Sequence, residues 1–177
     1  MWTPTPPTPS SPRQPRFGRK FEITSKCNAR CPGCSRTVKG ETHPLLNVAD
    51  FSYENFIKYV PAKALKNKYL EFCGVFGDAI MHKDVYKIFE YCKTAGASHI
   101  TLDTNGGVKS KEWWGKLAQL GVGVTFSVDG HRETNHLYRV NTKFSKILEN
   151  MKAFSKAGGT GCWEYIVFDH NESEIEI

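Results

Sequence analysis

From Phe21 onward, short runs of strand-forming residues alternate with longer runs whose apolar residues recur at helical spacing. The predicted strands lie at residues 21–25, 69–72, 99–102, 122–128 and 163–168. The predicted helices lie at 52–60, from 84 onward, at 110–120 and at 142–157, and Asn171 is expected to open another. Strands that alternate with helices in this way predict a parallel α/β sheet, either open or curled into a barrel.

The length of the chain limits how far such a barrel can close. The chain has 177 residues, whereas a closed barrel of eight β/α units typically needs about 250. We therefore expect an α/β fold, a partial barrel of about five parallel β/α units that is open on one side. In such sheets the chemistry gathers at the C-terminal ends of the strands, so functional residues are expected directly after them.

Residues 1–16 differ in composition from the rest. They hold six of the nine prolines, with Thr and Ser between them, which is typical of an extended, unpacked segment. We expect a Pro-rich disordered leader at 1–16 and one domain at 17–177. The first residues lack the apolar core of a signal peptide, and no apolar run approaches the roughly 20 residues of a membrane-spanning helix. The expectation is a soluble, cytoplasmic protein without a membrane partner.

The net charge of +6 is concentrated at the N-terminus. Residues 1–20 hold four basic side chains and no acid, which leaves 20 basic against 18 acidic residues in the remainder. This nearly balanced domain argues against nucleic acid as a partner.

Three of the six cysteines crowd into the segment directly after the first predicted strand. Cys27, Cys31 and Cys34 form a C-x3-C-x2-C triplet. Three thiolates on one loop can hold three irons of a 4Fe-4S cluster and leave the fourth iron open to a ligand. The alternatives are a zinc knuckle completed by His43 and three unrelated core cysteines. Polar residues between the cysteines, among them Asn28, disfavour burial of the loop.

The other three cysteines stand alone in apolar patterns. Cys73, Cys92 and Cys162 are predicted to be small hydrophobes and not metal ligands.

Polar residues follow the later strands too. Gly77 and Asp78 follow the second strand, where a glycine lets backbone approach a ligand closely and an exposed carboxylate can pair with an ammonium group. Asn105 follows the third strand in a Thr-Asn-Gly run that equally suits a turn. Ser127 and Asp129 follow the fourth and stand two residues apart, so they are expected to point to the same side.

The cysteine triplet at this place in a β/α series resembles the radical S-adenosylmethionine (SAM) superfamily, and the resemblance extends over about residues 20–175. The run from Cys73 to Asp78 is similar to the glycine-glycine-glutamate loop of the family, with Phe76 at the first glycine and Ala79 at the usual proline. The run from Asn135 to Arg139 resembles a segment of the subgroup that modifies peptides and proteins.

The resemblance implies roles for named residues. It implies a 4Fe-4S cluster on Cys27, Cys31 and Cys34, and SAM as the second cofactor. The implied SAM contacts are Gly77, Asp78, Asn105, Ser127, Asp129 and Arg139, with Asp78 at the amino group and Arg139 at the carboxylate. Many members place an aromatic residue against the adenine just before the third cysteine. Gly33 stands there, so the adenine is expected on apolar residues of the fourth and fifth strands.

The implied activity is cleavage of SAM to a 5'-deoxyadenosyl radical, which abstracts hydrogen from an unknown substrate, a peptide being one candidate. The electron would come from a donor such as a flavodoxin or ferredoxin. The sequence ends near the fifth strand, and Cys162 is the only cysteine after Cys92. Two other classes therefore stay open: an inactive or truncated relative, and a non-catalytic iron-sulfur or zinc protein.

Overall fold

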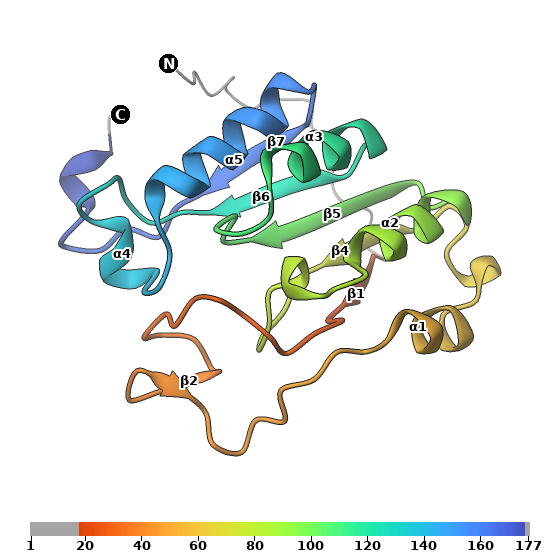
Figure 1. Cartoon of the computed structure of the whole chain (residues 1–177), viewed down its shortest axis with the longest axis horizontal. Helices are drawn as coiled ribbons and strands as arrows, with labels where there is room; N and C mark the ends of the chain where they lie inside the picture. Colours follow the sequence, from red (N-terminus) through yellow and green to blue (C-terminus); the bar gives the residue numbers. More distant parts are fainter. Residues whose placement is uncertain (1–17, 176–177) are drawn as a thin grey trace.

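The computed structural model describes residues 18–175, so the predicted leader lies outside the described residues. Five strands form one parallel sheet in the order β1-β4-β5-β6-β7. They are β1 (Arg19–Phe21), β4 (Tyr69–Phe72), β5 (His99–Thr104), β6 (Gly123–Ser127) and β7 (Gly161–Glu164). Within the described residues β1 and β7 remain the two edges of the sheet (Figure 1). The predicted α/β class and the open partial barrel are confirmed.

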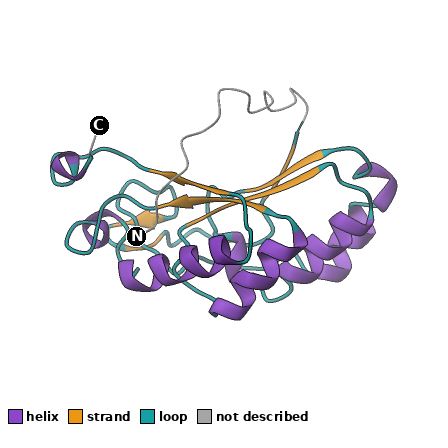
Figure 2. Ribbon diagram, turned by 90° about the horizontal axis from the view of Figure 1, so that it is seen from above, coloured by secondary structure: helices purple, strands orange, loops and turns teal. Residues whose placement is uncertain are grey.

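Helices cover one face of the sheet (Figure 2). The helices of the described chain are α1 (Tyr53–Tyr59), α2 (Val85–Thr94), α3 (Lys111–Leu120), α4 (Asn135–Tyr138) and α5 (Phe144–Lys156), with short 3-10 turns η1 (Ala62–Ala64), η2 (Ala79–Met81) and η3 (Glu172–Glu174). No helix among the described residues has the length and apolarity to cross a bilayer.

The two faces of the sheet differ because side chains alternate along each strand. Leu70, Leu102 and Phe126 represent the buried face, which packs on helix residues such as Trp114 and Phe154. The opposite face carries mostly polar, half-buried side chains, namely Glu71, Thr101, Asp103, Thr125 and Ser127. The open face is therefore polar. It adjoins the C-terminal ends of the strands, where the sequence predicts the functional residues.

Helix α3 ends where the sequence predicts and begins one residue later, at Lys111, with Ser110 as its N-cap. The Ser110 hydroxyl accepts a hydrogen bond from the backbone N–H of Trp113 at 3.3 Å and caps the N-terminus. Helix α2 differs from its prediction. Asp84 precedes it, but its side chain makes no capping hydrogen bond and instead pairs with Lys87 at 3.1 Å.

Both edge strands are shorter than predicted. After β1, Thr24 bridges to Asp50, and Phe51 N–H donates to the carbonyl of Ile23, so this part of the predicted first strand pairs away from the sheet. Strand β7 ends at Glu164, because the N–H of Ile166 donates to the Asp129 carboxylate at 2.7 Å and draws the chain off the sheet. The sequence analysis did not predict α4 or the small hairpin of β2 (Thr37–Val38) and β3 (Glu41–Thr42).

Candidate functional site

The loop after β1 and the C-terminal ends of β4, β5 and β6 enclose a pocket of about 310 Å³. Its lining contains eight of the nine residues singled out from the sequence: Cys27, Cys31, Cys34, Gly77, Asp78, Asn105, Ser127 and Arg139. Asp129 is the exception. The parallel topology accounts for this convergence, because neighbouring strands end at the same edge of the sheet.

The three loop cysteines approach the pocket with different exposure. Cys31 is buried, whereas Cys27 and Cys34 are half-buried. Burial raises the pKa of the Cys27 thiol to about 11 and also raises that of Cys31. The backbone N–H of Ala29 donates to the Cys27 sulfur at 3.4 Å, and Nη1 of Arg139 lies 3.9 Å from the Cys31 sulfur. Donors of this kind stabilise thiolates that bind iron-sulfur clusters.

The three loop sulfurs are not gathered as closely as ligands around a single zinc ion. Thiolates around one zinc lie about 2.3 Å from it, so their sulfurs are within roughly 4.6 Å of one another. The three loop sulfurs do not all lie within 4.8 Å of one another, whereas ligand atoms of Glu71, Cys73 and Asp103 do. The Nδ1 atom of His43, the candidate fourth zinc ligand, accepts a hydrogen bond from Leu45 N–H at 3.1 Å.

Arg36 is a buried cation beside the pocket that the sequence analysis missed. Its Nη1 donates to the carbonyls of Ser25 at 2.5 Å and Phe76 at 2.8 Å, and its Nη2 donates to the Thr42 hydroxyl at 3.2 Å. Its Nε is buried and has no partner among the described residues. A guanidinium with a spare buried donor fits a site that takes up an anionic group, such as a thiolate-bound cluster. Its position two residues after Cys34 was the only sequence signal.

Asp78 is buried, so the prediction of an exposed carboxylate is wrong. Its Oδ1 accepts from the N–H of Ile80, and its Oδ2 accepts from the Thr104 hydroxyl, the Asn105 N–H and the Asn105 side-chain amide at 2.7 to 2.9 Å. Burial raises the pKa of this carboxyl to about 6. Three of the four donors converge on Oδ2, whereas Oδ1 accepts a single hydrogen bond and keeps acceptor capacity for a ligand.

Gly77 serves the packing of the protein itself. A Cβ at this position would lie 1.9 Å from the carbonyl oxygen of Thr24. The close approach predicted for a ligand is therefore made by backbone of the first strand's extension. The Glu22 carboxylate accepts from the N–H groups of Phe76 at 2.6 Å and Gly77 at 3.0 Å and fixes the same loop.

Asn105 joins the end of β5 to the cysteine loop. Its side-chain amide donates to the Asn28 oxygen at 3.0 Å and lies 3.8 Å from the Cys27 sulfur, while its oxygen accepts from Gly107 N–H at 2.9 Å. Asn105 is therefore both a turn residue and a pocket residue, so both interpretations of the Thr-Asn-Gly run apply.

Asp129 and Arg139 form a buried ion pair. The Nε of Arg139 donates to Oδ2 of Asp129, and the Asp129 side chain is fully buried. Asp129 therefore stands behind the pocket wall and does not share the orientation of Ser127 that the sequence suggested. Arg139 alone of the pair lines the pocket.

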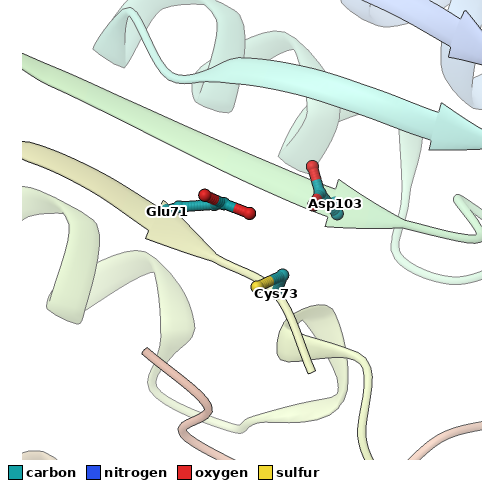
Figure 3. Close-up of side chains that lie close together, drawn as sticks. All are labelled: Glu71, Cys73 and Asp103. Atoms are coloured by element: carbon teal, nitrogen blue, oxygen red, sulfur yellow. The ribbon is translucent and has the colours of Figure 1, made fainter. Parts of the chain in front are cut away.

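Two of the three isolated cysteines lie in surroundings other than predicted. Cys92 is fully buried as expected, but Cys162 is exposed. Cys73 is half-buried on the polar face of the sheet, where ligand atoms of Glu71, Cys73 and Asp103 lie within 4.8 Å of one another (Figure 3). Burial, aided by Glu71, raises the pKa of the Cys73 thiol to about 11, so at neutral pH it is a thiol at the pocket wall.

A family model matches most of the chain. The family model described as the radical SAM superfamily matches residues 21–177. No curated protein matches the sequence.

Solved structures share the fold at low sequence identity. anSMEcpe with bound AdoMet has a TM-score of 0.63 at 17% identity and covers 81% of this chain. Streptococcus suis SuiB bound to S-adenosylmethionine has 0.69 at 13% and covers 89%, and BtrN in complex with AdoMet and 2-DOIA has 0.56 at 13% and covers 84%. The alignments span 42%, 36% and 58% of those chains, respectively.

These solved structures share the open parallel sheet with this chain. The family match extends over all five strands except the first two residues of β1, and over all three cysteines of the loop. The chain belongs to the radical SAM superfamily.

Proposed function

We propose that this protein is a radical SAM enzyme that carries a 4Fe-4S cluster on Cys27, Cys31 and Cys34. The observation that supports this most is the meeting of the three cysteines with Asp78, Asn105 and Arg139 around one pocket at the strand ends. The chain has the family's sheet and also the acid, amide and cation needed around a zwitterionic ligand.

The cysteine loop would supply three ligands for iron. Each thiol gives up its proton on binding metal, and the donors from Ala29 and Arg139 stabilise the resulting thiolates. When bound, the cluster would supply the single electron needed for reductive cleavage of SAM to methionine and a 5'-deoxyadenosyl group able to take a hydrogen atom from a substrate.

The remaining pocket residues would orient SAM by charge. Asp78 lines the pocket and would place its negative charge beside the amino group. Arg139 faces the pocket with its charge partly balanced by Asp129, and its remaining N–H donors suit a carboxylate. Arg36 adds a second buried cation behind the loop. Asn105 links the cysteine loop to Asp78 through hydrogen bonds to both.

We propose a peptide or protein as the substrate and a flavodoxin or ferredoxin as the electron donor. Structures of anSMEcpe were obtained with AdoMet and a Cp18Cys or Kp18Cys peptide, and the pocket of this chain reaches the polar face of the sheet through Asp103 and Ser127. A reducing cytoplasmic location suits an iron-sulfur cluster held by thiolates.

Anaerobic turnover without substrate tests the proposal. The protein is reconstituted with iron and sulfide, reduced with dithionite and given SAM, and 5'-deoxyadenosine is measured by mass spectrometry. We expect the product from wild type and from Cys162→Ala, whose thiol is exposed and outside the pocket, and none from Cys34→Ala. A wild-type protein that holds the cluster and binds SAM without releasing 5'-deoxyadenosine would contradict the enzymatic proposal.

A further inference from the structure

Gly33 lies between the second and third cysteines of the loop and faces an aromatic ring from another element. A Cβ built on Gly33 would lie 3.0 Å from the Tyr138 hydroxyl oxygen and 3.6 Å from its ring carbon Cε2. The backbone of Gly33 does not have a positive φ, so its conformation would accept a side chain. What fills the space of that side chain is the phenol ring of Tyr138.

Tyr138 lies at the end of α4 and lines the pocket together with Cys31 and Cys34. Its ring is held at 4.5 Å, centroid to centroid, from that of Phe168, and the Arg139 guanidinium lies 5.4 Å from its centroid. The hydroxyl makes no hydrogen bond with any described residue. The protein therefore fixes the ring and leaves the hydroxyl unused.

We propose that Tyr138 is the aromatic surface on which the adenine of SAM packs, in place of a side chain at position 33. The inference rests on the proposed function, since it concerns the same pocket. Tyr138 is half-buried and lines the pocket, so part of its ring is accessible to a ligand there, and stacking of a base on an aromatic side chain is worth roughly 1–3 kcal/mol. Ile166, which lines the same pocket and is 42% exposed, adds an apolar neighbour.

Substitution at Tyr138 separates the ring from the hydroxyl. The dissociation constant of SAM is measured by equilibrium dialysis on reconstituted proteins of equal iron content. Tyr138→Leu is expected to weaken SAM binding about 10-fold, because an aliphatic side chain keeps apolar volume but loses stacking. Tyr138→Phe is expected to stay within about two-fold of wild type, because it keeps the ring. The control is Tyr59→Leu, on an exposed side chain of α1 outside the pocket.

A swap of positions gives the second arm. Tyr138→Ala removes the ring, and Gly33→Phe in that background places a ring in the vacated space. We expect the double variant to bind SAM more tightly than Tyr138→Ala alone, and Gly33→Phe alone to bind poorly because its Cβ meets Tyr138.

The outcomes distinguish the inference from the proposed function. Tyr138→Leu binding SAM as tightly as wild type, Tyr138→Phe losing as much as Tyr138→Leu, or a double variant no better than Tyr138→Ala would overturn the role of the ring and leave the enzymatic proposal intact. A wild-type protein that takes up a cluster but does not bind SAM would overturn both.

Discussion

Asp78 combines a buried charge with hydrogen bonds that hold the pocket together, so its protonation state has two consequences. Burial raises the pKa of this carboxyl from its ordinary value of 3.8 to about 6 in the folded protein. As the pH rises from about 4 to 6, the unfolded chain therefore ionises first and the contribution of this group to the free energy of unfolding falls. Binding of the positively charged amino group of SAM nevertheless requires the ionised form of the Asp78 carboxyl.

The pH dependence of SAM binding follows. One unit below its pKa, about a tenth of the Asp78 carboxyl is ionised, so SAM should bind roughly 10-fold more weakly at pH 5 than at pH 7.5. Equilibrium dialysis at the two pH values measures this, with cluster absorbance as the check that iron is retained. Asp78→Asn should bind weakly at both. An equal affinity of wild type at pH 5 and 7.5 would mean that the Asp78 charge is not used.

The ion pair of Arg139 and Asp129 leads to a stability prediction. Removal of one partner from a buried pair leaves an uncompensated charge and typically costs about 3–5 kcal/mol. Arg139→Met is therefore expected to lower the free energy of unfolding by about 3 kcal/mol, since Asp129 is fully buried. Arg139→Met with Asp129→Asn should recover part of the loss, because the lone charge is gone. Urea unfolding measures both, and a double variant less stable than the single one would refute this explanation.

Several site residues were predictable because their chemistry depends on sequence spacing. The cysteine triplet and the acid after β4 fall at strand ends, and topology alone brings such positions together. The burial of Asp78, the pairing of Asp129 with Arg139 and the positions of Arg36 and Tyr138 were not predictable. They depend on contacts between side chains that are distant in the sequence, and a local sequence pattern does not predict such contacts.

Helix α3 depends on its first turn. Ser110 caps the helix through the N–H of Trp113, and the helix packs Trp114 and Leu117 into the core. Ser110→Ala is expected to lower the free energy of unfolding by about 1 kcal/mol. The matched control is Ser155→Ala, an exposed serine inside α5, which should change little. Equal effects of the two substitutions in urea unfolding would rule out a specific role for the cap.

The elements that the sequence predicted well are those with strong periodicity. Strand β4 has its predicted bounds, and α5 follows from the spacing of Ile147, Met151 and Phe154. The hairpin of β2 and β3 and the single turn of α4 are too short to carry a period. The pairing of Thr24 with Asp50 and the early end of β7 arise from tertiary hydrogen bonds.

As a whole, the molecule is a sheet with one apolar face under helices and one polar face that is open within the described residues (Figure 2). The pocket lies at the edge of the sheet where the loops that follow β1, β4, β5 and β6 begin. Cys73 on the polar face adds a fourth thiol to the lining of the pocket. A cluster held by three cysteines would leave one iron open to SAM, whereas a cluster held by four cysteines would be fully ligated and could only carry electrons.

Low-temperature electron paramagnetic resonance of the reconstituted, dithionite-reduced protein, with and without SAM, tests this point most directly. We predict about four irons per chain and a reduced-cluster signal that changes when SAM is added. Cys73→Ala should keep both properties, and Cys27→Ala should lose the cluster. A signal that SAM leaves unchanged, or loss of iron on Cys73→Ala in a protein that still folds, would contradict a three-cysteine cluster that holds SAM.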